Sequence, residues 1–509
     1  MLRCGLAAAT LVLAALDAAQ GLAFCPIDHQ DVMWDTWLYK NPKTGEWLLN
    51  YLEHHHGGPW NAVGSALSAD GAHWADAGPG VRMDCSPTNK TDCAVWLGSG
   101  SVWKKLAAAG QEDAEDEWIM NYSQEYDCHA EGDENGGLSS KKGGCQSIFF
   151  ATSKDLVNWT PVAPDAEKNG GYVFKYNTSE YARGRWDCIA VLPRPDGGYY
   201  GYWTATPLGR ADLCGIGKNC GAGFGQSDDG LHWTTLPTPG PAIGAEVGGL
   251  CQLGGKTFMT FDAGHLFQAP AATGPFTAVA DNYKFFTQEG HSAFARLWGE
   301  LYTGDKELAL LSHQQIAGKA IYAGLIKQVV LGEDGVLRAQ WWSNNDVLKA
   351  EALTPVTAAD GKATTECVGA CLSSGLWLEG TITPSGSTPQ GVWVELNGTA
   401  LKKASCGFGF AMDGSGNFTL GEMTSETGSM TEPLVIDRAM KLAKGAPVNF
   451  TLVLRNAWSG FGMSEFYVNG VLALPFTLPA ALTGNFAATD GHSVKISSVN
   501  RLSLPEVSR

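Results

Sequence analysis

Three segments of the chain share one short pattern, in which a serine is followed at fixed distances by an aspartate and a tryptophan. The segments are SALSADGAHW, FATSKDLVNW and FGQSDDGLHW, which end at Trp74, Trp159 and Trp233. Aspartate closes turns through bonds to its own backbone, and apolar residues on both sides of a turn predict a pair of strands. Each copy therefore indicates a β-hairpin, and the recurrence predicts a fold of repeated hairpin units joined by loops of variable length.

Further strand-like runs, in which apolar and polar residues alternate, surround these hairpins. They lie at 46–52, 117–123, 198–205, 256–263 and 307–313. No convincing amphipathic helix interrupts them, and about four strands per unit over residues 30–345 make about five units, the content of a small β-propeller. The sequence therefore predicts a five-bladed β-propeller over residues 24–348.

The remaining chain has a different spacing of strands and turns, which indicates a second domain. Residues 349–370 lose the hairpin pattern and are interpreted as a linker with room for a strand. Beyond them, the pairs Asn397-Gly398 and Asn469-Gly470 favour two-residue hairpin turns between alternating runs. Residues 371–509 are therefore predicted to form a β-sandwich. The predicted fold class is all-β, a five-bladed β-propeller followed by a C-terminal β-sandwich.

The N-terminus has the pattern of a secretory signal peptide over residues 1–23, with one arginine, an apolar run and then small residues. The run is shorter than a bilayer-spanning helix, so we expect a secreted protein, or a vacuolar or cell-surface one in a eukaryote, without a membrane partner. Seven Asn-x-Ser/Thr sequons are compatible with glycosylation. Several cysteines at short spacings favour loop-closing disulfides. These pairs are Cys85/Cys93, Cys128/Cys145, Cys214/Cys220 and Cys367/Cys371.

The charge balance excludes some classes of partner. With 35 Lys+Arg against 52 Asp+Glu, the net charge of −17 repels phosphate backbones, so no nucleic-acid partner is predicted. The cysteines and histidines lack the spacing of zinc ligands, so neither a metal nor another cofactor is predicted.

Three acidic residues stand at the start of predicted first strands. Asp35 in VMWDTWLY opens the first strand of unit one, Asp187 in RGRWDCIAVL that of unit three, and Glu246 in GAEVGGLCQL that of unit four. A propeller gathers the first strand of every blade around its axis, so these carboxylates are predicted to point into a central pocket. A buried carboxylate is costly without a partner or a task, although turn capping is an alternative role.

Glycoside hydrolysis is the chemistry that needs acidic groups around a sugar-sized pocket. One carboxylate attacks the anomeric carbon, a second protonates the leaving oxygen, and a third steadies the ring. Glutamate suits the proton donor because its longer side chain reaches the glycosidic oxygen. The first two groups lie about 5–5.5 Å apart in retaining enzymes and about 6.5–9.5 Å apart in inverting ones.

At these residues the chain resembles glycoside hydrolase family 32, the invertases and other β-fructosidases, over most of residues 25–480. VMWDTWLY resembles the family's WMNDPNG strand, RWD its RDP motif and GAEVGG its EC motif, with further likeness in VWLGSGSVW (95–103) and SEFYVNGV (464–471). The resemblance implies a secreted, retaining glycosidase acting on a β-fructofuranoside such as sucrose or a fructan. It implies Asp35 as nucleophile, Glu246 as acid/base and Asp187 as stabiliser of the ring.

The chain departs from the family pattern at several of these motifs. The DPNG tetrapeptide is absent, Asp31 is a second candidate for the nucleophile, and Val247 replaces the motif's cysteine. Arg185 lies two residues before Asp187 instead of next to it, which in a strand places both on one face, where they can form an ion pair. Two alternatives stay open: an inverting arabinosidase or xylosidase, as in the related family 43, and an inactive carbohydrate-binding homologue.

Aromatic and histidine residues near the predicted pocket are candidates for substrate contacts, because an indole offers a flat platform for a sugar face. Together with Arg185 they are Trp34, Trp37, Trp60, Trp96, Trp186 and His291. Core packing is the alternative for each tryptophan, and a structural hydrogen bond is the alternative for His291. His54, His55 and His56 are adjacent, so they cannot all ligate one metal, and we predict that they line the pocket mouth. The expected partner is an oligo- or polysaccharide.

Overall fold

The computed structural model describes much of the chain from residue 33 onward. The described residues are 33–53, 60, 62–82, 96–106, 116–126, 145–162, 172–182, 185–208, 221–241, 243, 245–261, 264–279, 292–299, 308–316, 320–357, 363–365, 374–383, 390–396, 407–413, 418–423, 430–436, 445–456, 461–478, 480–488 and 494–503. The predicted signal peptide, Asp31, His54, His55, His56 and His291 lie outside them, and so do the side chains of the short-spaced cysteine pairs.

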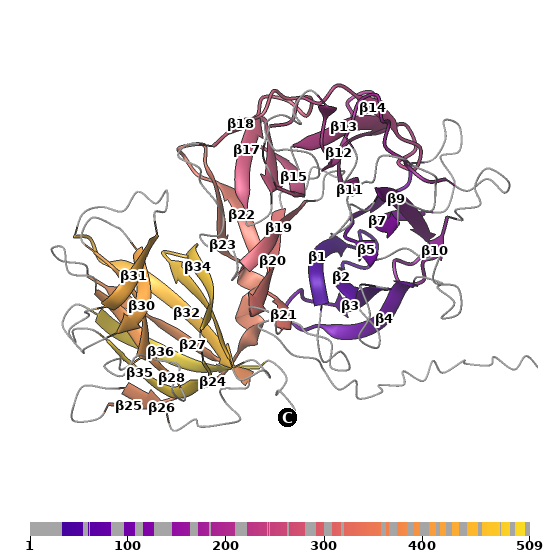
Figure 1. Cartoon of the computed structure of the whole chain (residues 1–509). Coiled ribbons are helices and arrows are strands. Elements are labelled where there is room, and N and C mark those ends of the chain that lie inside the picture. The colour runs from indigo at the N-terminus through magenta and orange to yellow at the C-terminus, as the bar shows by residue number, and fades with distance from the viewer. Residues whose placement is uncertain are drawn as a thin grey trace, which may run out of the picture.

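Four sheets of short antiparallel strands form the first four blades of a ring (Figure 1). Blade 1 consists of β1 (Met33–Lys40), β2 (Trp47–Glu53), β3 (Ala62–Ser68) and β4 (Ala75–Arg82). Blade 2 consists of β5 (Trp96–Gly98), β6 (Val102–Lys104), β7 (Trp118–Tyr126), β9 (Cys145–Ser153) and β10 (Thr160–Pro161). Blade 3 consists of β11 (Asp187–Pro193), β12 (Tyr199–Thr204), β13 (Ala222–Ser227) and β14 (Thr234–Leu236). Blade 4 consists of β15 (Val247–Leu253), β16 (Lys256–Phe261), β17 (His265–Ala269) and β18 (Thr277–Ala278).

The fifth blade continues into the C-terminal domain through one 11-stranded sheet. The blade consists of β19 (Ser292–Gly299), β20 (Leu308–Ile316), β21 (Ala320–Ala323), β22 (Lys327–Leu331) and β23 (Leu337–Trp341). Gln340 of β23 pairs with Val471, which joins the blade to the sandwich. The predicted five-bladed propeller followed by a sandwich is confirmed. The strand-like runs predicted from the sequence form the second strand of each sheet: 46–52, 117–123, 198–205, 256–263 and 307–313 correspond to β2, β7, β12, β16 and β20.

Two sheets make the sandwich (Figure 1). The first contains β24 (Lys349–Ala352), β27 (Leu376–Ile382), β32 (Val448–Asn456), β33 (Gly462–Val468), β34 (Val471–Leu478) and β36 (Val494–Leu502). The second contains β25 (Pro355–Thr357), β26 (Ala363–Thr365), β28 (Gln390–Leu396), β29 (Gly407–Met412), β30 (Phe418–Met423), β31 (Met430–Ile436) and β35 (Leu482–Ala488). The predicted turn at Asn469-Gly470 joins β33 to β34, with φ of +48° and +77° at its two residues, the left-handed backbone that such hairpins require.

Three short strands, β24, β25 and β26, lie within residues 349–370, the segment expected to be a linker with room for a strand. A 3₁₀ helix, η4 (Ser343–Leu348), ends the propeller, and β24 then pairs with β36. Strands β25 and β26 form a hairpin that pairs with β35. The sequence rhythm was weak there because these strands have only three or four residues, too few for a visible alternation.

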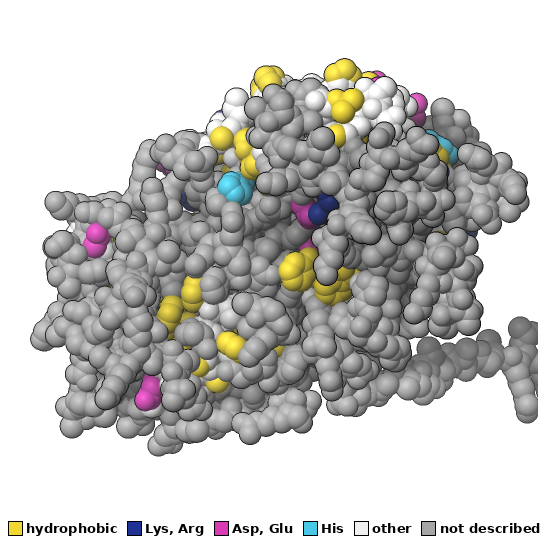
Figure 2. Space-filling model, viewed as in Figure 1, with side chains coloured by type: hydrophobic (Ala, Val, Ile, Leu, Met, Phe, Trp, Pro, Cys, Tyr) yellow, Lys and Arg dark blue, Asp and Glu magenta, His cyan; other side chains and the backbone are white. Residues whose placement is uncertain are grey.

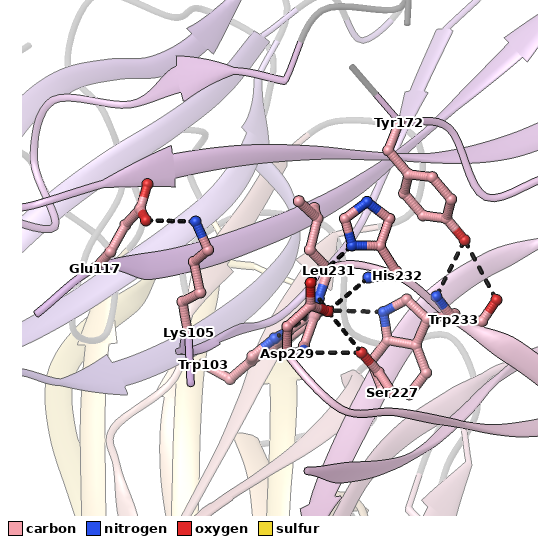
Figure 3. Close-up of polar contacts among 10 residues, drawn as sticks. Trp103, Lys105, Glu117, Tyr172, Ser227, Asp229, Leu231, His232 and Trp233 are labelled. Carbon is pink, nitrogen blue, oxygen red and sulfur yellow. Dashed lines mark hydrogen bonds and ion pairs between the residues drawn. The ribbon is translucent and has the colours of Figure 1, made fainter. Parts of the chain in front are cut away.

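The repeated Ser-x-Asp-x-x-x-Trp segments form the same hydrogen-bonded turn in three blades. In blade 3, Asp229 Oδ1 accepts bonds from the backbone N–H groups of Leu231 and His232 at 2.8 Å each, and Ser227 Oγ accepts one from Gly230 at 2.8 Å (Figure 3). Trp233 then enters the core. Matching bonds form at Asp70 and Asp155. Each turn therefore joins the last two strands of its blade, as the hairpin prediction requires.

A continuous core crosses from the propeller into the sandwich. Buried residues of blades 1 and 5 pack in one cluster with Trp377 and Tyr467 of the sandwich. The side chains of Lys327 and Glu465 form an ion pair at this junction, and both are fully buried. A second cluster fills the space between the two sandwich sheets. Among the residues described, no helix has the length and apolar character that a membrane crossing requires.

Candidate active site

The first strands of four blades each change register near their N-terminal ends. The shifts lie between Trp34 and Thr36, between Asp187 and Ala190, between Val247 and Gly249, and between Ala293 and Arg296. A bulge re-aims side chains and ends regular pairing, which is why bulges are common beside active sites. The three predicted carboxylates, Asp35, Asp187 and Glu246, therefore stand at or immediately before bulges in β1, β11 and β15.

Two of these bulges contain a strained backbone. Asp35 has φ of +40° and Cys188, which follows Asp187, has φ of +58°. Residues other than glycine adopt this left-handed region rarely and at a cost of about 1–3 kcal/mol. The surrounding blades must stabilise both conformations, and both aim side chains toward the ring centre instead of along a regular strand.

Arg185 brings two of the predicted carboxylates together. Its Nη2 lies 2.8 Å from Asp187 Oδ2, and its Nη1 forms an ion pair with Glu246 Oε1. The exposed side-chain fractions are 31% for Arg185, 16% for Glu246 and 1% for Asp187. The predicted ion pair of Arg185 with Asp187 is confirmed. Its second partner, Glu246, comes from the next blade and was not predicted.

Asp35 belongs to the same electrostatic cluster. Burial raises the pKa of Asp35 well above its usual range, and the nearby charges of Glu246 and Asp187 raise it further. Arg296 and Arg185 oppose this rise. Burial would lower the pKa of Arg185, but Glu246 and Asp187 hold that pKa well above its usual range. The structure thus brings Asp35, Asp187 and Glu246 into one electrostatic cluster.

Asp187 is held tightly by residues of blade 2. Gln146 Nε2 donates to Asp187 Oδ2 at 3.4 Å, while Gln146 Oε1 accepts from the backbone N–H of Trp186 at 3.3 Å. Gly98 lies so close that a Cβ atom there would meet both carboxylate oxygens of Asp187 at 2.9 Å. Asp187 Oδ1 is buried and accepts no hydrogen bond from the described residues, and the same is true of Asp35 Oδ1. Both oxygens are acceptors suited to the hydroxyls of a ligand.

The aromatic candidates divide into two groups. Trp34, which precedes Asp35 in the chain, and Trp60 are half-buried and stack on each other with ring centroids 6.0 Å apart. Trp37 and Trp186 are 2% and 0% exposed and pack in the core, so these two present no face to a ligand and take the packing role that was the alternative. The side chain of Trp96 and the whole of His291 lie outside the described residues.

Basic and acidic side chains reach the surface together near the middle of the propeller face, with hydrophobic side chains beside them (Figure 2). The partly exposed Arg185 and Glu246 give the site its access to solvent. No group of three or more His, Cys, Asp or Glu within the described ranges is arranged to hold a metal ion.

Sequence reasoning missed four buried residues of this site. They are Ser99, Gln146, Cys188 and Arg296. Ser99 lies in VWLGSGSVW and Cys188 follows Asp187, so both were close to motifs that had been singled out. Gln146 and Arg296 belong to no motif that was singled out, and only the folding of separate blades around one axis brings them to the carboxylates.

Comparison with known proteins gives a structural match without a sequence match. A scan against models of protein families finds no match, and a search of curated proteins finds none. The family 32 β-fructofuranosidase of Bombyx mori superposes with a TM-score of 0.63 at 12% identity, covering 94% of each chain. The fold is that of glycoside hydrolase family 32.

Two further solved structures show the same fold. The exo-inulinase of Aspergillus awamori has a TM-score of 0.63 at 13% identity and covers 95% of this chain and 98% of its own. The fructofuranosidase of Schwanniomyces occidentalis, solved with fructose, has a TM-score of 0.61 at 12% identity and covers 96% and 99%. At such low identities these superpositions establish the common propeller and sandwich. The chemistry must be argued from the residues of this chain.

Proposed function

We propose that this protein is a retaining glycoside hydrolase that cleaves β-fructofuranosides such as sucrose or a fructan. One observation carries the proposal: Arg185 joins Asp187 and Glu246, which belong to different blades, next to a buried Asp35. Two carboxylates bound to one guanidinium, with a third buried carboxyl that feels the charges of both, match the needs of glycoside hydrolysis. The fold shared with fructofuranosidases and an inulinase supports the choice of a fructoside.

In the first half of the reaction, Asp35 attacks the anomeric carbon of the fructosyl unit while Glu246 protonates the departing glycosidic oxygen. The electron pair of the broken C–O bond goes to that oxygen, and fructose stays bound to Asp35 as an ester. Low solvent access around Asp35 strengthens its attraction to the positive charge that develops on the sugar ring.

In the second half, Glu246 removes a proton from a water molecule, which attacks the anomeric carbon and releases Asp35. Asp187 accepts hydrogen bonds from ring hydroxyls through its unpartnered Oδ1, and Arg185 fixes the orientation of Asp187 and Glu246 through its two amino groups. Trp34 and Trp60 supply an apolar wall beside the nucleophile.

The test is release of monosaccharide from sucrose, inulin, levan, arabinan and xylan by the purified chain. Glu246→Gln and Asp35→Asn run beside it and should lower kcat by at least about a thousand-fold with an unchanged circular dichroism spectrum. Release of fructose with retained anomeric configuration supports the proposal. Release of arabinose or xylose with inversion, or sugar binding without any hydrolysis, contradicts it and selects one of the alternatives.

We also propose that the chain is secreted and glycosylated, on the basis of its N-terminal pattern and its sequons. The sequon asparagines differ in accessibility. Asn177 is exposed, whereas Asn121 is fully buried and its Oδ1 accepts a hydrogen bond from the backbone N–H of Ser101 at 2.8 Å. Mass spectrometry of protein secreted by a eukaryotic host should find a glycan on Asn177 and none on Asn121. A glycan on Asn121 or its absence from Asn177 would contradict this assignment.

A further inference from the structure

Arg296 is a buried arginine at the centre of the propeller. It lies on β19, the first strand of blade 5, at the bulge where the pairing of β19 with β20 shifts between Ala293 and Arg296. Its side chain is 2% exposed. A buried guanidinium needs several acceptors to offset the loss of its hydration, so its contacts show what holds it there.

The guanidinium of Arg296 binds to three other blades. Its Nη1 donates to the backbone oxygens of Val247 at 3.2 Å and Gly248 at 2.9 Å, in the bulge of blade 4. Its Nη2 donates to Ser99 Oγ at 2.8 Å in blade 2, and to Cys188 Sγ at 3.6 Å in blade 3. One planar guanidinium thus links blade 5 to blades 2, 3 and 4. The compact ammonium group of a lysine cannot make this set of divergent hydrogen bonds.

Three of these four contacts lie one or two residues from a carboxylate of the site, and the fourth, Ser99, follows a glycine that packs against one. Val247 follows Glu246, and Cys188 follows Asp187 in the strained bulge of β11. Ser99 follows Gly98, the residue that lies against the carboxylate of Asp187. A shift of the guanidinium would therefore displace the backbone that carries Glu246 and Asp187.

The positive charge of Arg296 also acts on Asp35. Burial and the charges of Glu246 and Asp187 raise the pKa of Asp35, and Arg296 is the stronger of the two cations that lower it, ahead of Arg185. Two further titratable groups belong to the same surroundings, the buried thiol of Cys188 and the buried Glu53 at the end of the neighbouring strand β2. A nucleophile must be ionised, so a nearby cation favours the reactive form of Asp35.

We propose that Arg296 is a positioning residue that holds the backbone beside Asp187 and Glu246 and supplies positive charge near Asp35. This inference rests on the proposed function, because it assigns Asp35 the task of a nucleophile. The hydrogen bonds described for Arg296 go to Val247, Gly248, Ser99 and Cys188, so the role proposed for it is exerted through the neighbouring residues Asp187, Glu246 and Asp35.

The experiment measures kcat and KM of Arg296→Gln, Arg296→Lys and wild type from roughly pH 3 to 8, with the fructoside that the wild type hydrolyses as substrate. Arg296→Gln removes the charge, so the acidic limb of the kcat/KM profile should move to higher pH by roughly one unit. Its kcat should fall about tenfold or more, with KM changed by less than about threefold. Arg296→Lys should restore the position of the limb and leave kcat reduced, because the charge remains and the planar guanidinium is lost.

The matched control is Arg194→Gln, an arginine of blade 3 whose partners Asp196 and Asp228 lie at the surface. Its profile should coincide with that of wild type. The proposal would be overturned if both Arg296→Gln and Arg296→Lys fold, keep the wild-type kcat and show the acidic limb of the kcat/KM profile at its wild-type pH. Should Arg296→Gln fail to fold, the lysine variant decides alone, and a wild-type kcat in that variant overturns the proposal.

A second measurement does not depend on hydrolysis. In protein labelled with ¹³C at the aspartate carboxyl carbon, with the Asp35 signal assigned from Asp35→Asn, the titration midpoint of Asp35 should rise in Arg296→Gln. A raised midpoint without fructose release contradicts the proposed function and leaves the placement of Arg296 intact. Fructose release with an unmoved midpoint supports the function and overturns the role of Arg296.

Discussion

Arg185 of blade 3 forms an ion pair with Glu246, the residue that precedes the first strand of blade 4. The same guanidinium binds Asp187 at 2.8 Å, so it holds one candidate acid and one candidate stabiliser at a fixed separation. Because the two carboxylates come from different blades, the site forms only when blades 3 and 4 are packed. Catalytic geometry and propeller assembly are therefore linked through Arg185.

Substitution of Arg185 by lysine should impair catalysis while leaving the fold intact. An ammonium group cannot make the two divergent bonds to Asp187 and Glu246, although it keeps the charge. We expect kcat/KM to fall about ten- to hundredfold, with the larger change in kcat because orientation is lost. Steady-state kinetics beside Arg194→Lys would check this, and a variant of Arg185 with wild-type kcat would contradict it.

Asp35→Asn should inactivate the protein and stabilise it. Burial raises the pKa of Asp35 above its usual value of 3.8 in the folded state, so between these two values the folded protein binds a proton that the unfolded chain has lost. Wild-type stability therefore falls as the pH rises through this window. The asparagine variant lacks this cost.

The melting temperature of Asp35→Asn should therefore exceed that of wild type at pH 7, by about 2–4 °C for each kcal/mol gained in the free energy of unfolding. The difference between the two melting temperatures should shrink as the pH approaches about 4. Asp196→Asn, at an exposed carboxyl, is the control and should show no such gain. Equal melting temperatures of Asp35→Asn and wild type across the pH range would show that Asp35 carries no burial cost.

Gly98→Ala should damage both stability and activity. The added methyl would overlap Ser123 Oγ and lie 2.9 Å from the oxygens of Asp187, so neighbouring groups must move. Overpacking of this kind costs about 1–3 kcal/mol in urea unfolding. Adding Ser123→Ala removes the nearer obstacle, so the double variant should regain stability but not activity, since Asp187 stays displaced. Full recovery of activity in the double variant would argue against close packing of Gly98 on Asp187.

The buried pair of Lys327 and Glu465 should matter for stability at the junction of propeller and sandwich. Glu465 Oε2 also accepts a bond from the hydroxyl of Tyr467 at 2.5 Å, so removal of Lys327 leaves an uncompensated charge among groups without access to water. Lys327→Met should cost about 3–5 kcal/mol. Lys43→Met, which removes an exposed partner of Asp116, should cost less than about 1 kcal/mol. Urea unfolding of both variants measures the contrast, and equal losses would contradict it.

Most of the fold could be predicted because its signals are local. The three Ser-x-Asp-x-x-x-Trp turns bond within a few residues of Asp70, Asp155 and Asp229, so their sequence specifies their geometry. The alternating second strands were equally clear. The pairing of the short strands within residues 349–365 could not be read from the sequence, because their partners β35 and β36 lie more than 100 residues further along the chain and do not affect the local alternation.

The site was predictable only in part. Asp35, Asp187 and Glu246 were found because each stands at the start of a first strand, a position that a propeller carries to its axis. For Trp37 and Trp186 the sequence left pocket wall and core packing both open, since an indole in either place has the same neighbours in sequence, and the structure shows both side chains buried in the core. Gln146 and Arg296 were missed because no motif marks them.

The sequence by itself determined the hairpin units, the order of propeller and sandwich, and which carboxylates begin the inner strands, because turns and alternation depend on neighbouring residues. Only the tertiary structure decided that Arg185 reaches Glu246 and that Arg296 binds blades 2, 3 and 4. Those contacts join residues of separate blades, and their existence depends on how the blades close around the axis. Burial there also sets the pKa of Asp35, because desolvation is a property of the packed site and not of the residue.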